Sequence, residues 1–182
     1  MEKIERIMKT LYDLEEGIRR CTACPLWEGR TLAVPGEGSG NIMFIGDVPE
    51  AEENRMGRPF VGPSGEILDE MLEIVHLTRA KCFITNACKC RPQHNHKPNV
   101  EELSTCKEEW LDEQIGIIKP KLIVLMGELS LKLMFGGGDF ETLRGKVIDK
   151  KFFITHCPHE ALKHPNSKKQ MKKDFEKLAS IL

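Results

Sequence analysis

The sequence predicts a three-layer α/β/α fold built on a four-stranded parallel sheet. Four short segments are continuous apolar runs, as is typical of strands buried on both faces. Helical patterns separate these runs, so strands and helices alternate as they do around a parallel sheet. The chain has 182 residues, of which 40% are hydrophobic and 30% charged. This length and composition predict a single domain that spans residues 1–182.

A first helix is predicted over residues 1–20, because apolar residues recur there at spacings of three and four. Its apolar face comprises Ile4, Ile7, Met8, Leu11, Leu14 and Ile18. The segment is charged and amphipathic, unlike the apolar centre of a signal peptide. No apolar run approaches the roughly 20 residues of a membrane span. We therefore expect a cytoplasmic protein.

The first half of the sheet follows. Residues 41–46 form a short apolar run bounded by glycines, which predicts a strand. Residues 64–75 predict a helix that Ser64 can cap, with five apolar residues on one face. Residues 81–86 are the second apolar run and the second predicted strand.

The second half repeats this alternation. A polar loop leads into a helix predicted over 100–118, and Pro120 precedes a strand predicted over 121–127. A short helix over 128–135 is expected to end at the glycine run 136–138. The last strand and the last helix are predicted over 151–156 and 166–182.

Binding sites of parallel sheets lie beyond the carboxyl ends of the strands. The segments that follow the four strands all carry polar or reactive side chains: GDVPEAEE, NACKCRP, GELS and THCPH. The functional site is therefore predicted among these segments.

Seven cysteines are unusual for a cytosolic chain and indicate a metal or redox site rather than disulfides. Cys21 and Cys24 have the CxxC spacing of a chelating pair, and Cys90 and Cys106 can supply the remote ligands. Four thiolates suit either zinc or an iron–sulfur cluster. Because a zinc ribbon normally repeats CxxC, zinc is the second choice.

The other cysteines have plainer interpretations. Cys82 lies in an apolar strand and is expected to be a small buried hydrophobe. Cys88 lies two residues before Cys90 and is an alternative ligand.

These motifs together resemble the thermophile-type, family-4 uracil-DNA glycosylases. The resemblance runs from about Arg20 to Leu182. It rests on CTACPL, on the stretch 46–72 with its GRPFVGPSG segment, on FITNACKCRP, on Cys106 and on the THCP element.

The resemblance implies roles for individual residues. Cys21, Cys24, Cys90 and Cys106 would hold a [4Fe–4S] cluster of mainly structural role. Asp47 and the backbone of Val48 would lie near a flipped base. Phe60 would stack on uracil, Asn86 would read its edge, and Glu53 would crowd the C5 side against the methyl group of thymine. The loop after the last strand, with His156 and Cys157, would stabilise negative charge on the base.

The chemistry of base excision agrees with these roles. A base in a duplex must be extruded into a pocket before it can be cut from its sugar. Phe60 offers an aromatic face, and Asn86 offers a donor and an acceptor in one neutral group. Other interpretations stay open at this point: Phe60 in the core, Asn86 in a cap or turn, and Asp47 bonded to backbone.

The chain departs from the family in two motifs. Asp47 and Glu50 stand where the family has glutamate and glycine, and Cys157 stands where it has histidine. A thiol donates hydrogen bonds poorly. The expected function is hydrolysis of the N-glycosidic bond of uracil in DNA by a monomeric repair enzyme. The alternatives are a homologue that binds DNA without cutting it and a glycosylase for another deaminated base.

Charge along the chain also bears on DNA. Residues 144–177 contain ten Lys or Arg and four Asp or Glu. This basic segment suits contact with phosphates, although a solvated lysine-rich helix would have the same composition.

Overall fold

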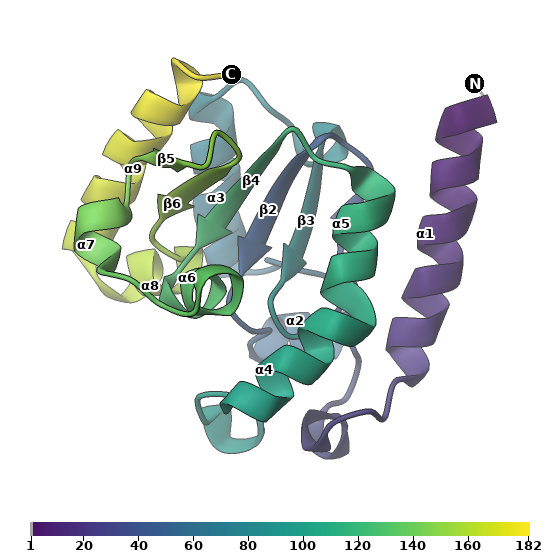
Figure 1. Cartoon of the computed structure of the whole chain (residues 1–182). Helices are drawn as coiled ribbons and strands as arrows, with labels where there is room; N and C mark the ends of the chain where they lie inside the picture. Colours follow the sequence, from purple (N-terminus) through teal and green to yellow (C-terminus); the bar gives the residue numbers. More distant parts are fainter. Residues whose placement is uncertain (1) are drawn as a thin grey trace.

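The computed structural model describes residues 2–182, with side chains from Thr10 onward. Its central sheet has the strand order β1-β3-β2-β4-β6-β5 (Figure 1). The four predicted strands form its parallel centre, which confirms the fold class. They are β2 (Ile42–Gly46), β3 (Cys82–Asn86), β4 (Leu122–Met126) and β6 (Phe152–Thr155).

The sheet is wider than predicted, because a short antiparallel strand pairs with each edge. These are β1 (Glu37–Gly38) beside β3 and β5 (Val147–Ile148) beside β6. A two-residue strand is too short to produce a hydrophobic pattern, so the sequence gives no sign of either.

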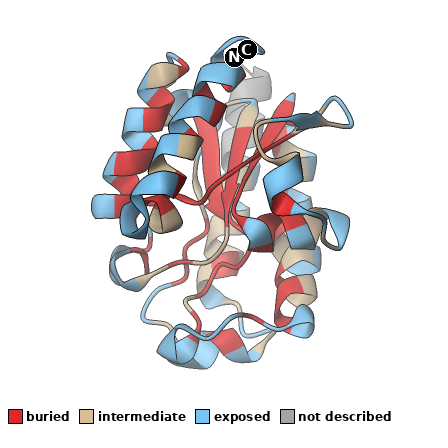
Figure 2. Ribbon diagram, turned by 90° about the vertical axis from the view of Figure 1, so that its left-hand side faces the viewer, coloured by how far each residue is buried: buried red, intermediate tan, exposed pale blue. Residues whose placement is uncertain are grey.

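Three helices cover one face of the sheet: α3 (Pro63–Ile74), α8 (Pro158–Lys163) and α9 (Pro165–Ala179). Phe44 and Phe153 of the strands pack there against Leu68 of α3 and Phe175 of α9. Figure 2 shows the buried strands enclosed between helices whose outer faces are exposed. This is the first of the two outer layers.

The opposite face is covered by the chain from residue 100 to 143. Its helices are α4 (Val100–Cys106), a π-helical turn (Lys107–Leu111), α5 (Asp112–Ile118), α6 (Glu128–Phe135) and α7 (Phe140–Leu143). The first three are continuous and together match the predicted helix 100–118. The π-helical turn begins directly after Cys106, and such turns are frequent at functional sites.

Helix α1 (Glu2–Arg20) lies outside α5 (Figure 1). Of its predicted apolar face, Ile18 is buried, and Leu11 and Leu14 are half-buried. The side chains of Ile4, Ile7 and Met8 lie outside the described residues.

The remaining elements are short and were not predicted. They are η1 (Pro25–Gly29), α2 (Ala51–Met56), η2 (Arg79–Lys81) and η3 (Gln93–Asn95). Helix α2 follows β2 directly and begins with a capping box between Glu50 and Glu53. This box fixes the loop that follows the first central strand.

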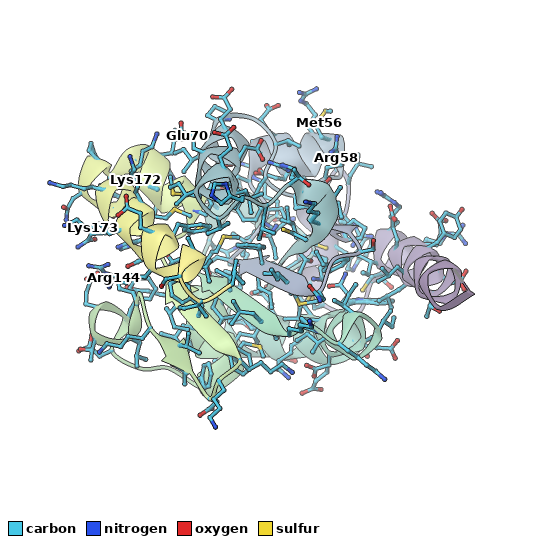
Figure 3. The ribbon with its side chains drawn as sticks, turned by 90° about the horizontal axis from the view of Figure 1, so that it is seen from above. Met56, Arg58, Glu70, Arg144, Lys172 and Lys173 are labelled. Atoms are coloured by element: carbon cyan, nitrogen blue, oxygen red, sulfur yellow. The ribbon has the colours of Figure 1, made fainter. Side chains whose placement is uncertain are left out.

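Among the described residues, no helix is long and apolar enough to cross a membrane. Lysines line the exposed side of α9, where Lys168 pairs with Glu70 of α3 at 2.8 Å. Figure 3 shows Lys172 and Lys173 pointing outward from α9, away from the sheet.

Candidate active site

Asn86 and Phe60 meet beside the end of β2. Gly46, the last residue of β2, pairs with Asn86 of β3. A side chain at Gly46 would collide with both the Phe60 ring and Asn86 Oδ1. Asn86 is 2% exposed, and its Oδ1 is the one buried side-chain oxygen or nitrogen without a hydrogen-bond partner among the described residues. An orphaned buried acceptor is costly in a folded protein, so it marks a place where a ligand can bind.

A single arginine holds the loop that carries Phe60. Phe60 has a φ of +49°, which is unfavourable for a bulky residue. Arg79 donates to the carbonyl oxygens of Phe60 at 2.6 Å and Pro59 at 3.2 Å. It is itself anchored by Asp69 at 2.7 Å and Glu37 at 2.9 Å. The position of the Phe60 ring therefore depends on this clamp.

Asp47 extends from the end of β2 towards the start of α6. Its Oδ1 accepts a hydrogen bond from the backbone N–H of Ser130 at 2.8 Å. The carboxylate occupies the space that a side chain at Gly127 would need. Burial raises the pKa of Asp47 to about 7. Hydrogen bonds from backbone N–H groups lower this pKa, but their effect is smaller than that of burial. About half of the molecules therefore carry this charge at neutral pH.

The raised pKa predicts that ionised Asp47 destabilises the fold. Between about pH 4 and pH 7 the folded state binds more protons at Asp47 than the unfolded state, so stability falls as pH rises. Asp47→Asn should remove this dependence and increase the free energy of unfolding at pH 8 by about 1–3 kcal/mol. Denaturant unfolding of both proteins at pH 5 and pH 8 measures it. An equal stability difference at both pH values would contradict the assignment.

Cys157 precedes α8 and lies against Asp47. Burial raises the pKa of its thiol strongly, and the Asp47 carboxylate raises it further. The side chain is therefore a neutral thiol at physiological pH and not a thiolate nucleophile.

Glu53 and His159 complete the group around Phe60. Glu53, 1% exposed, accepts from Ser64 Oγ at 3.2 Å and from the N–H of Glu50 at 3.1 Å. His159 Nε2 lies 3.5 Å from Glu53 Oε1, and its ring centroid lies 6.0 Å from that of Phe60. Burial acts to raise the pKa of Glu53, but His159 and the backbone donors outweigh it and leave this pKa below its usual value.

His156 does not join this group. Its Nε2 donates to Gln170 Oε1 at 2.7 Å, and its Nδ1 lies 3.3 Å from Glu160 Oε2. Its ring packs beside Phe140 of α7. The structure thus places His156 against α7 and α9 and gives no geometric support for a catalytic role. Val48 is half-buried and packs against the core on the α4–α6 side.

The four predicted ligand cysteines line one cavity. Cys21 and Cys24 follow α1, Cys90 follows β3, and Cys106 ends α4. Arg30 and Trp110 line the same cavity. Cys82 and Cys88 are buried but do not line the cavity, although Cys88 lies beside it and hydrogen-bonds to Cys106.

Hydrogen-bond donors surround the sulfur atoms. Trp110 Nε1 donates to Cys21 Sγ at 3.1 Å, Arg30 Nη1 donates to Cys90 Sγ at 3.1 Å, and the N–H of Lys89 donates to Cys106 Sγ at 3.3 Å. Such donors stabilise thiolates, so the residues fit an anionic cysteine site. As the side chains are placed, no three His, Cys, Asp or Glu residues of the described chain are grouped closely enough to hold one metal ion.

Lys89 lies between the cysteines and the end of β3. It is 1% exposed, and its Nζ donates to Thr85 Oγ1, to Gln114 Oε1 and to the carbonyl oxygen of Asn86 at 2.7–2.8 Å. Burial lowers the pKa of Lys89 to about 8, while the neighbouring cysteines raise it. Lys89 thus links the two sites: its backbone N–H donates to Cys106 Sγ, and its side chain donates to the backbone of Asn86.

Comparison with known proteins identifies the family. Residues 35–179 match the family model described as the uracil DNA glycosylase superfamily. The chain belongs to this superfamily. The match includes all four central strands and therefore every residue placed around Asn86 and Asp47 above.

Relatives within the superfamily match most of the chain. A type-4 uracil-DNA glycosylase of Sulfurisphaera tokodaii is 41% identical, over 96% of this chain and 86% of its own length. A type-4 uracil-DNA glycosylase of Thermotoga maritima is 36% identical over 93% of both chains. A type-5 uracil-DNA glycosylase of Pyrobaculum aerophilum is 31% identical over 62% of this chain.

The structure adds three residues to the candidate site that the sequence motifs do not single out: His159, Arg79 and Lys89. His159 follows the THCP element directly, and the sequence does not distinguish it from an ordinary loop histidine. Arg79 lies in a segment without a motif, and its role depends on contacts with residues 59 and 60 that no sequence pattern shows. Lys89 lies in the CKCRP motif, but its burial and its hydrogen bonds to Thr85 and Gln114 are visible only in the structure.

Proposed function

We propose that the protein is a type-4 uracil-DNA glycosylase, which hydrolyses the N-glycosidic bond of uracil in DNA. The observation that carries the proposal is the orphaned Oδ1 of Asn86 beside the Phe60 ring. Uracil presents an N3–H donor next to its O4 acceptor, and one carboxamide can satisfy both. The type-4 relatives, whose matches cover more than nine-tenths of this chain, support the same activity.

On the base side, the side chains bind and orient. Phe60 stacks on the flipped base, held in place by Arg79, and Asn86 accepts from N3–H and donates to O4. Glu53 lies at the edge of this group. That it excludes thymine by crowding the C5 methyl group stays a prediction. The cost of extruding the base is least for a mispaired uracil.

On the sugar side, the proposed group is Asp47. As the electron pair of the N–C1′ bond leaves with the base, positive charge develops on the sugar. An ionised Asp47 stabilises that charge and orients the attacking water, whose oxygen bonds to C1′ and whose proton passes to the carboxylate. The rate should therefore rise with pH up to about 7.

We infer that Cys21, Cys24, Cys90 and Cys106 hold a [4Fe–4S] cluster. The support is the shared cavity and the donors on three of the four sulfurs. When bound, the cluster cross-links α1, the loop after β3 and α4, and its role is structural.

DNA is the proposed partner. The protein is proposed to act as a monomer and to bind DNA at the carboxyl edge of the sheet. The outward lysines of α9 point away from the sheet and so suit general attraction of DNA rather than contact with the flipped nucleotide.

Cleavage of oligonucleotides that contain uracil, hypoxanthine or xanthine tests the function. We expect abasic sites only with uracil, measured by alkaline cleavage under single-turnover conditions. Cutting of hypoxanthine or xanthine alone would favour a glycosylase for another deaminated base. Tight binding of uracil-containing DNA without cleavage would favour a binding protein. Cys157 is the residue that favours this alternative, because a thiol is a weak hydrogen-bond donor.

A further inference from the structure

His159 occupies a distinctive position in the first turn of α8. Its Nε2 lies 3.5 Å from the carboxylate of Glu53, and its ring lies beside Phe60. Its Nδ1 lies 4.0 Å from the sulfur of Cys157, which itself lies against Asp47. One imidazole thus touches the stacking residue, a buried carboxylate and the thiol next to the sugar-side acid.

Excision of a base requires a donor for the negative charge that forms on the leaving base. A donor aimed at this charge is worth more in the transition state than in the ground state. Cys157 donates weakly, Asp47 offers negative charge, and His156 is bonded to Gln170 on another element. The Arg79 guanidinium also contacts the loop that carries Phe60, but Asp69, Glu37 and the carbonyl oxygen of Phe60 already accept its hydrogen bonds. Beside Cys157, the His159 imidazole is a stronger hydrogen-bond donor than the thiol.

Glu53 orients this imidazole. An ionised carboxylate that accepts a hydrogen bond from one ring nitrogen fixes the orientation of the ring. Hydrogen bonding from His159 is among the factors that keep the pKa of Glu53 below its usual value. With Nε2 directed at Glu53, the second ring nitrogen is Nδ1, whose neighbour is the Cys157 sulfur at 4.0 Å, a weak hydrogen-bond partner that a base can displace.

We propose that His159 donates a hydrogen bond from Nδ1 to the negative charge on the departing base, and that Glu53 is its positioning residue. The inference rests on the proposed function and extends it by naming the imidazole donor, which comes two residues after Cys157. His159 keeps its proton throughout, because it acts only as a hydrogen-bond donor. The electron pair of the broken bond stays on the base, and solvent later protonates it.

The test compares His159→Gln and His159→Asn with His164→Gln in the cluster-bearing protein. His164 is an exposed histidine between α8 and α9, so its substitution is a matched control. Three quantities are measured: the single-turnover excision rate, the affinity for uracil-containing DNA, and inhibition by free uracil. We expect both His159 variants to cut about 10- to 100-fold more slowly. DNA affinity and uracil inhibition should stay within threefold of wild type.

The second and third readouts separate a donor from a residue that only shapes the pocket. A pocket-shaping residue would weaken binding of free uracil as much as it slows excision. Glu53→Gln should slow excision in the same direction, and the double variant Glu53→Gln/His159→Gln should be little slower than His159→Gln alone, since the two residues act as a unit.

The outcomes distinguish this inference from the function on which it rests. A wild-type protein that carries its cluster but does not cut uracil-containing DNA would overturn both. A wild-type protein that cuts, together with His159 variants within threefold of its rate, would overturn the role of His159 and leave the function intact. Equal losses in excision rate and uracil binding would also overturn it.

Discussion

Asn86→Ala is expected to slow excision of uracil by about 30- to 1000-fold. The substitution leaves the N3–H and O4 groups of the bound base unpaired in a buried pocket, at a cost of about 2–4 kcal/mol in the transition state. Single-turnover cleavage of a uracil-containing duplex at saturating enzyme measures the change. An exposed asparagine in η3, Asn95, provides the control variant Asn95→Ala.

The same substitution should not destabilise the protein, although Asn86 is almost fully buried. Removing a buried acceptor that has no partner relieves a penalty of about 1–3 kcal/mol, which offsets the small cavity that is created. Thermal unfolding and iron content should therefore match the wild type. A rate within threefold of wild type, or a large loss of stability, would show that Asn86 has a structural role instead.

The centre of the fold was predictable because its signal is strong. Each central strand is a mainly apolar run, as is typical of strands that are buried on both faces. The two edge strands and the four-residue α7 were not predictable, since pairing with one neighbouring strand or packing at one loop decides them. Tertiary contacts, rather than local preference, form such elements.

The candidate site was predictable to the extent that its residues follow strand ends. Asn86 and Asp47 come at or just after β3 and β2, so the sheet itself brings them together. Phe60 depended on the resemblance, because the Arg79 clamp that places it is not visible in the sequence. The histidines of the last motif could not be told apart. His156 and His159 lie three residues apart, yet His156, just before α8, is directed towards Gln170, and His159, in the first turn of α8, is directed towards Glu53.

Cys106→Ala is expected to abolish iron binding and most of the folded protein. Cys106 is buried at the junction of α4 and the π-helical turn, where it faces cysteines that are distant in the chain. Without this ligand, the Arg30 guanidinium and the buried ammonium of Lys89 lose part of the negative charge beside them, and α1 loses its link to α4. Breaking a buried charge network of this kind costs about 3–5 kcal/mol, a large share of a domain's stability.

Iron content, visible absorption and thermal unfolding after anaerobic purification measure this prediction. The wild type should contain about four irons per chain and absorb broadly through sulfur-to-iron charge transfer. Cys82→Ala is the matched control, because Cys82 is equally buried but lies in β3 within the apolar core, so it should keep its iron. Cys88→Ala tests the alternative ligand next to Cys90 and should also keep its iron. Stoichiometric zinc in place of iron, or loss of iron from Cys88→Ala but not from Cys106→Ala, would show that the ligand set is wrong.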